Sequence, residues 1–265
     1  MTIDLFTQAD IEQMDQLGIK VEEARRQMAI LKKGPRWSAL RRPCTPGDGI
    51  AVIERKQQER LISLWQEAVN RGRFSTFLPA SGAATRMFAF LERIRNRLDR
   101  VTFEGMAEEF EATSEDYLEF RDFIESLNEF AFVEPLAEAM SQAGISLQEK
   151  LQLQDYSEIL AFLLDARGLK YGSMPKALIP FHRYADHCRT ALEEHLVEAI
   201  DTVRDQEGRC RLHFTVAPEH ENEVKIFARE AAAKYGKNFE VKYEVNFSTQ
   251  SPATNTLALD SENGP

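Results

Sequence analysis

Apolar residues recur with helical spacing through the first part of the chain. Met28 and Leu31 fall on one face of an amphipathic run, and a stripe of apolar residues predicts a further helix over residues 54–70. Thr7, with an acidic residue three positions later, is typical of a helix start. The pattern therefore predicts an N-terminal helical segment over residues 1–72.

The pattern changes after this segment. Residues 74–80 (FSTFLPA) are short, aromatic and apolar, which is typical of a buried strand. A turn of small residues follows, and residues 87–98 then have helical spacing. Residues 99–167 are acidic and amphipathic with helical stripes, which predicts a helical insertion. This strand–turn–helix order is the opening of an α/β unit.

Strands and helices alternate again after the insertion. Residues 176–181 are expected to be a strand or an extended loop, and residues 209–217 and 238–248 are expected to be strands. Helices are expected over residues 192–204 and from Pro218 onward. We therefore expect a three-layer α/β domain over residues 73–265, with a parallel-leaning sheet of roughly four strands.

Charge and cysteine content narrow the function classes. The chain has 43 acidic and 33 basic residues and a net charge of −10, which disfavours nucleic-acid polymers because these require a basic face. Three scattered cysteines without a CxxC pair indicate reduced thiols in the cytoplasm. No signal pattern and no run of about 18 apolar residues occurs, so we expect a cytoplasmic protein without a membrane span.

The strongest candidate site is the turn SGAATR. Its small residues let a ligand approach the main chain, and amides at a helix N-terminus favour an anion. An arginine adds a planar fork suited to phosphate oxygens. The alternative is a tight turn with a surface arginine. The predicted phosphate-binding residues are Ser81, Gly82, Ala83, Ala84, Thr85 and Arg86.

Two other segments offer candidate residues. Lys176 follows a proline in MPKALIPF and is a positioned charge suited to phosphate. Gln250 follows a predicted strand, where its amide could contact a nucleobase. The alternatives are an ordinary strand start and a polar turn. His182, His187 and His195 lack the helical spacing of metal ligands, and we expect His195 to be a surface or partly buried histidine.

The stretches SGAATR and PKALIP together resemble the paired motifs of the nucleotidyltransferases that make nucleoside-diphosphate sugars. The resemblance implies a Rossmann-like, nucleotidyltransferase-type sheet. It also implies that the backbone of residues 81–84 and Arg86 hold nucleotide phosphates, and that Lys176 neutralises phosphate or sugar-phosphate charge. Gln250 would approach the base of a uridine nucleotide. The chain departs from the pattern at Ala83 and Ala84, where the enzymes favour glycine.

The resemblance further implies a uridine nucleotide and a sugar phosphate as partners and Mg²⁺ as cofactor. Its metal-binding aspartate would fall beyond residue 264, and Asp260 is a possible substitute ligand. The whole chain also resembles the front half of a bacterial family with a domain of unknown function. We therefore expect a nucleotidyltransferase-like protein that is complete only in a longer chain. The sequence indicates no oligomeric state.

Two alternatives come from different classes. The chain could be a non-catalytic nucleotide-binding or regulatory protein that kept the fold and lost the chemistry. It could also be an interaction scaffold whose partner surface is the acidic helices of residues 99–167.

Overall fold

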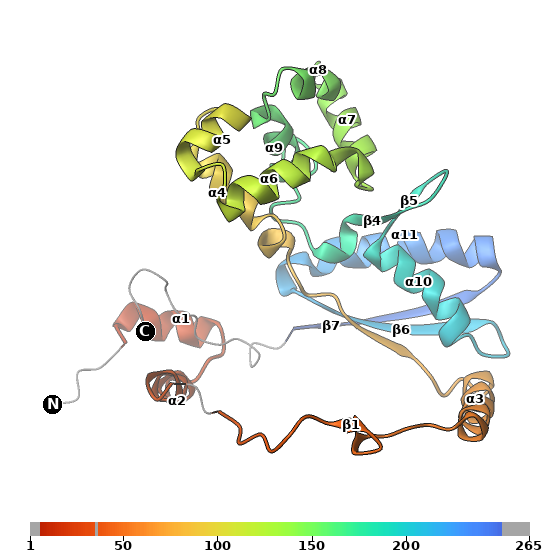
Figure 1. Cartoon of the computed structure of the whole chain (residues 1–265). Helices are drawn as coiled ribbons and strands as arrows, with labels where there is room; N and C mark the ends of the chain where they lie inside the picture. Colours follow the sequence, from red (N-terminus) through yellow and green to blue (C-terminus); the bar gives the residue numbers. More distant parts are fainter. Residues whose placement is uncertain (1–5, 35–36, 251–265) are drawn as a thin grey trace. The chain divides into compact units, whose positions relative to one another are not determined.

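The computed structural model describes residues 6–34 and 37–250, and it is a mixed α/β structure, mostly helical, with small sheets (Figure 1). The chain divides into two compact units. One runs from Gln66 to Thr249, and the other comprises the described residues before Gln66 together with Gln250. The division at residue 72 stays a prediction. No helix within the described ranges is long and apolar enough to cross a membrane.

We call the unit that holds the residues before Gln66 the first unit and the Gln66–Thr249 unit the second. The first unit confirms the predicted helix start at Thr7. The Thr7 side chain accepts a hydrogen bond from the Asp10 amide, and the Thr7 amide donates to the Asp10 carboxylate at 2.7 Å. Of the 16 residues of the α3 helix, which crosses the boundary between the units, Val69 is buried. These elements are α1 (Gln8–Gln16), α2 (Val21–Lys32), β1 (Thr45–Pro46), β2 (Gly49–Ile50) and α3 (Arg55–Asn70).

The helices in the upper part of Figure 1 pack around one hydrophobic cluster in the second unit. Phe120, Leu136 and Ile159 are fully buried in it. Most of these helices fall within the predicted insertion, residues 99–167. The elements are η1 (Ala84–Arg86), α4 (Ala89–Arg97), α5 (Phe103–Phe110), α6 (Glu115–Glu125), η2 (Leu127–Glu129), α7 (Val133–Gln142), α8 (Leu147–Gln152) and α9 (Ser157–Leu164).

The main sheet has three parallel strands in the order β3–β6–β7. They are β3 (Thr76–Pro79), β6 (Arg209–Val216) and β7 (Lys242–Thr249). Leu78 pairs with Phe214, which pairs with Phe247 on the other side. Because the strands are parallel, their carboxyl ends meet at one edge of the sheet, and the turn that follows β3 leaves from this edge.

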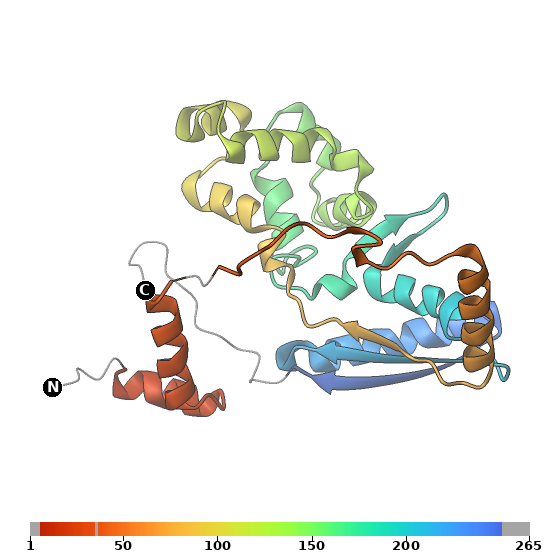
Figure 2. The same cartoon turned by 60° about the horizontal axis from the view of Figure 1, so that its bottom comes forward.

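Two helices cover one face of this sheet, α10 (Ala191–Thr202) and α11 (Glu221–Phe239) (Figures 1 and 2). The buried side chains of β6, such as Leu212 and Phe214, pack against them. On the opposite face His213 is half-buried and Phe77 is 64% exposed. The two helices that pack on the sheet thus share one face, and a three-layer, Rossmann-like sheet is not confirmed.

Residues 176–181, expected to be a strand or an extended loop, are divided between a short turn and the start of a strand outside the main sheet. Residues Lys176–Leu178 form a 3₁₀ turn, η3, and β4 (Pro180–Arg183) pairs antiparallel with β5 (Cys188–Thr190) in a separate hairpin. Pro175 precedes this stretch and Pro180 lies within it, and neither proline has the amide proton that a central strand must donate. Among the residues that the structure describes, the main sheet therefore has three strands, whereas roughly four were expected.

The last strand also begins later than expected. After η4 (Pro218–His220), helix α11 continues to Phe239 and ends at Glu240, which adopts a left-handed conformation with φ 55°. The alanine-rich run in this helix favours helical continuation. The strand therefore starts at Lys242 and not at residue 238.

Candidate functional site

The structure brings the first two candidate motifs together. The Ala84 amide donates to the Met174 carbonyl at 2.9 Å, and the Lys176 amide donates to the Gly82 carbonyl at 3.0 Å. Ala83 lies between them in an antiparallel bridge to Pro175. The turn after β3 and the segment entering η3 therefore hold each other in place, although the helical part of the chain separates them in sequence.

A cavity of about 400 Å³ lies beside this paired backbone, and we call it the Lys176 cavity. It lies at the carboxyl end of β3, where ligands bind in open parallel sheets. Its walls come from β3, η3, β4, α10 and β6. The residues that line it are Leu78, Pro79, Ala80, Gly82, Lys176, Ala177, Phe181, His182, Ala191, His195 and Phe214.

Gly82 gives this cavity a stretch of bare main chain. The residue is exposed, and a Cβ atom added to it would meet no atom within 4 Å. The space above the backbone is therefore open, and a ligand can approach Gly82 without displacing a side chain. This is the feature that the small residues of the turn predicted.

Three nitrogen-bearing side chains line the Lys176 cavity. Lys176 is exposed on η3, and His182 and His195 come from β4 and α10. The Nδ1 atom of His195 lies 2.9 Å from a carboxylate oxygen of Glu198, so Nε2 is the ring nitrogen that can serve a ligand. Lys176 and His182 can donate hydrogen bonds to an anion, whereas Nε2 of His195 donates only when the ring is protonated, because Nδ1–H is already directed at Glu198.

Sequence reasoning did not select either histidine as a site residue. His195 is half-buried, which fits the expectation of a partly buried helix residue. Neither residue has the spacing of a recognised motif with Lys176, because the hairpin and α10 bring them together in space. The available signal was the clustering of histidines shortly after the PKALIP stretch.

A partly buried network positions the two histidine-bearing elements. The Glu194 carboxylate on α10 accepts a hydrogen bond from the Tyr184 hydroxyl at 2.8 Å and pairs with Arg189 at 3.2 Å. Burial tends to raise the pKa of Glu194, but these hydrogen bonds outweigh it and leave that pKa below its ordinary value. The network therefore fastens the β4–β5 hairpin to α10.

The remaining predicted residues lie outside the lining of the Lys176 cavity. Ser81 and Ala83 are half-buried, and Thr85 and Arg86 are exposed. Gln250 directly follows β7 and belongs to the other compact unit.

The predicted helix N-terminus at the turn needs a correction. Residues Ala84–Arg86 form a single 3₁₀ turn, and α4 begins only at Ala89. The Ala84 amide is used by Met174, and the Met87 amide donates back to the Ala84 carbonyl at 2.8 Å. The Ala84 amide, which was predicted to bind a ligand, is instead bonded to the segment that enters η3. Sequence patterns do not reveal this pairing.

The lining of the Lys176 cavity does not fit Mg²⁺. Among its residues the polar side chains are one lysine and two histidines, with no carboxylate, whereas Mg²⁺ takes oxygen ligands. Within residues 6–34 and 37–250, no group of three or more histidine, cysteine, aspartate or glutamate side chains could hold a metal ion. Asp260, the predicted substitute ligand, lies outside the described residues.

Fold and site together define a mixed α/β protein with a basic cavity at the carboxyl edge of a small parallel sheet. The chain belongs to the family described as Domain of unknown function (DUF4301), whose model matches residues 7–265. This confirms the expected domain-of-unknown-function family over nearly the whole chain. No curated protein and no solved structure matched the chain, and no link to the nucleotidyltransferases was found.

Proposed function

We propose that this chain is a nucleotidyltransferase-like protein that binds a uridine nucleotide and a sugar phosphate at the Lys176 cavity. One observation carries the proposal. The backbone pairing of Gly82 and Ala84 with Lys176 and Met174 sets an uncovered glycine main chain and a lysine ammonium group beside the same cavity. A close main-chain approach and a nearby positive charge are what a phosphate group requires.

The proposed chemistry uses the cavity for positioning and charge neutralisation. A sugar-phosphate oxygen attacks the nucleotide α-phosphate, a new O–P bond forms, and pyrophosphate leaves. Lys176 neutralises phosphate charge, His182 donates a hydrogen bond to a phosphate oxygen, and His195 donates one through Nε2 in its protonated form. None of these groups forms a covalent bond to the substrate.

The test is a calorimetric titration of the full chain with UTP and with a UDP-sugar. Lys176→Ala and Gly82→Ala should each weaken binding about tenfold or more, equal to about 1.4 kcal/mol. Because a Cβ at Gly82 meets open space, the melting temperature of Gly82→Ala should stay unchanged. Lys237→Ala is the matched control, since it removes the same charge from an exposed position on α11.

Other outcomes would select another function. Nucleotide binding without pyrophosphate release on addition of a sugar 1-phosphate, with and without MgCl₂, would favour the non-catalytic nucleotide-binding alternative. Equal affinity for ATP and UTP would remove the uridine preference. Absence of nucleotide binding would overturn the proposal. Arg86→Ala, compared with Arg229→Ala at another exposed arginine, tests the predicted role of Arg86.

A further inference from the structure

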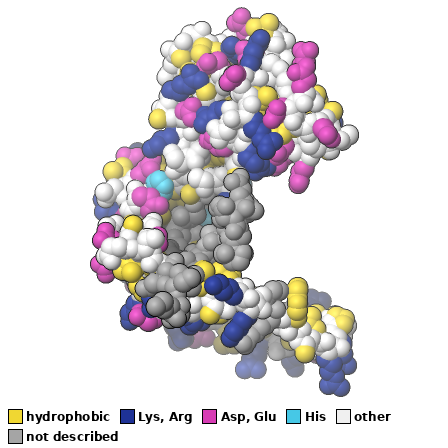
Figure 3. Space-filling view, turned by 90° about the vertical axis from the view of Figure 1, so that its left-hand side faces the viewer, with side chains coloured by type: hydrophobic (Ala, Val, Ile, Leu, Met, Phe, Trp, Pro, Cys, Tyr) yellow, Lys and Arg dark blue, Asp and Glu magenta, His cyan; other side chains and the backbone are white. Residues whose placement is uncertain are grey.

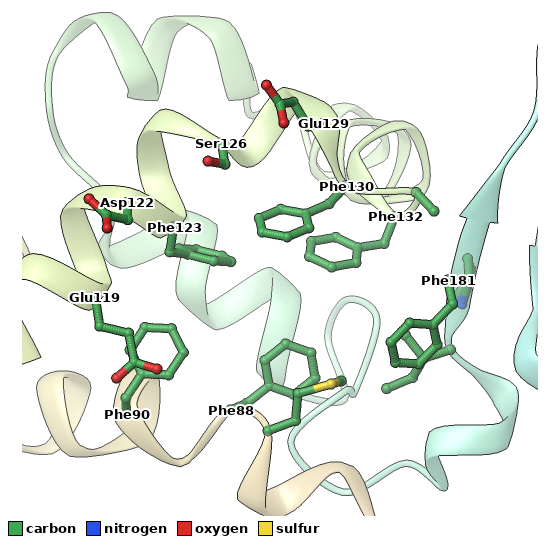
Figure 4. Close-up of a pocket in the computed structure, with 14 residues that line it drawn as sticks. Phe88, Phe90, Glu119, Asp122, Phe123, Ser126, Glu129, Phe130, Phe132 and Phe181 are labelled. Carbon is green, nitrogen blue, oxygen red and sulfur yellow. The ribbon is translucent and has the colours of Figure 1, made fainter. Parts of the chain in front are cut away.

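A second cavity, of about 560 Å³, lies between the helical part of the second unit and β4 (Figure 4). Aromatic side chains dominate its walls, and we call it the phenylalanine cavity. In Figure 4 their rings surround the cavity from several elements. These residues are Phe88, Phe90, Phe123, Phe130, Phe132 and Phe181.

The aromatic wall is held in a fixed geometry. The rings of Phe130 and Phe132 stack with centroids 5.0 Å apart, and Phe123 stacks on Phe130 at 5.5 Å. Phe123 and Phe132 are buried in the helical core, whereas Phe130 is half-buried. Protein interiors are otherwise close-packed. A space of this size between fixed aromatic rings has the volume and lining of a small-molecule site.

Carboxylates supply the charge of this cavity. Glu119, Asp122 and Glu129 are exposed and line it, and no lysine or arginine is among its described lining residues. Asp122 accepts a hydrogen bond from Arg121 at 3.0 Å, and the charge of Glu119 is partly offset by Arg93, so the acidic character comes from Glu129 and the remaining charge of Glu119. In Figure 4 these carboxylates lie at the periphery of the group of rings.

The two kinds of lining suit two parts of one ligand. Because Phe123 and Phe132 stack on the two sides of Phe130, the rings serve mainly as an apolar surface, and the carboxylates supply the negative charge that attracts a cation. The rings also exclude water from the apolar part of a ligand. Inorganic cations would gain little from the rings, and phosphate-bearing anions would be repelled by the carboxylates.

We infer that the phenylalanine cavity binds an organic ammonium ion. Its apolar body packs against Phe123, Phe130 and Phe132, and its charged group is neutralised by Glu119 and Glu129. The inference does not rest on the proposed nucleotide site. The phenylalanine cavity and the Lys176 cavity have one described lining residue in common, Phe181.

The test compares choline with its uncharged carbon isostere, 3,3-dimethylbutan-1-ol, by calorimetry on the full chain at constant ionic strength. Choline should bind at least tenfold more tightly, because the two probes differ in charge and hardly in shape. Glu119→Gln and Phe130→Leu should each weaken choline binding several-fold. Glu109→Gln is the control, since it removes the same charge from an exposed position on α5 outside the cavity.

Several results would overturn the inference. These are equal affinity for the two probes, no choline binding, or unchanged binding in both cavity variants. Displacement of choline that does not level off as the uridine concentration rises would show that a nucleobase occupies the cavity, because linkage between two separate cavities levels off. Phe130→Leu is melted in parallel to check folding, and Glu119→Gln keeps the test decisive because Glu119 is exposed. The affinity for choline should be unchanged in Lys176→Ala. The two proposals can therefore fail independently, because this variant affects only the nucleotide site.

Discussion

At the scale of single residues, Gly82 and Gly168 have opposite surroundings. A Cβ atom at Gly168 would overlap the carbonyl oxygen of Phe162, whereas one at Gly82 would meet nothing within 4 Å. The first position tolerates no side chain without movement of the backbone. The second position has no such restriction, so the open space above its backbone can be filled by a ligand.

Gly168→Ala should therefore lower the free energy of unfolding by about 2 kcal/mol or more, because the new methyl group overlaps a backbone atom. Gly82→Ala should leave it within about 0.5 kcal/mol. Urea denaturation of both variants measures the difference. Similar values for the two would contradict the close packing around Gly168.

Asp205 illustrates a buried charge with several partners. Its carboxylate accepts the amides of Glu207 and Arg209, each at 2.9 Å, and pairs with Arg211 at 3.2 Å. Burial alone would raise its pKa, but the hydrogen bonds from the Arg209 amide and guanidinium and from the Glu207 amide lower the pKa to about 2, from 3.8. The charged form is thus the one that the fold stabilises.

Asp205→Ala should lower the free energy of unfolding at pH 7 by about 3 kcal/mol, because it leaves the amides of Glu207 and Arg209 without their charged acceptor. The folded pKa lies below the unfolded value of 3.8, so this stabilisation is present above about pH 4 and is lost as the pH falls toward 2. Urea denaturation at pH 7 and pH 2.5 should show the gap narrowing. Asp201→Ala, at an exposed residue, should show no gap.

At the scale of elements, the start of α10 carries more than a local cap. Thr190 and Glu193 form a capping box, and both are buried. The Glu193 carboxylate also accepts a hydrogen bond from the Tyr235 hydroxyl at 3.2 Å and contacts Lys234 at 3.3 Å. The box therefore connects α10, which carries His195, to α11.

Thr190→Ala should lower the free energy of unfolding by about 1–2 kcal/mol, since it removes a buried cap. It should also lower the affinity of the Lys176 cavity for its ligand, because α10 forms one wall of this cavity. Thr7→Ala removes the exposed capping box of α1 in the other unit and is the matched control. An equal loss of ligand affinity in both variants would argue against this role of Thr190.

Sequence patterns predicted the elements that are set by interactions between residues close together in the sequence. The Thr7 cap, the strand at Thr76–Pro79 and the strand at Arg209–Val216 follow from spacing and side-chain type. The hairpin at Pro180–Arg183 did not, because its partner strand and not its own apolar residues sets its pairing. The same reason hid His195, whose direction depends on the packing of α10.

At the scale of the molecule, two hydrophobic clusters lie wholly between Ala84 and Val241. Met174 packs against both, next to the backbone pairing of the two motifs. On the face in Figure 3, acidic and basic side chains are interspersed over the helical part. On this face the acidic side chains do not form one continuous patch, and the scaffold alternative stays a prediction.

A fragment of residues 55–249 should fold on its own, because it contains both clusters and the whole of α3. Its melting temperature should lie within about 5 °C of that of the full chain. Circular dichroism measures both. A fragment of residues 55–240, which lacks β7, is the control and should not fold cooperatively, since Val245 and Phe247 pack against the second cluster.

Phe181 stands between the Lys176 cavity and the phenylalanine cavity and forms part of both walls. A ligand that turns this half-exposed ring while filling one cavity must change the shape of the other. Equilibrium binding at the two places would then be linked, and linkage is reciprocal: each ligand changes the affinity of the other by the same factor. One aromatic side chain would thereby act as the allosteric element of the molecule.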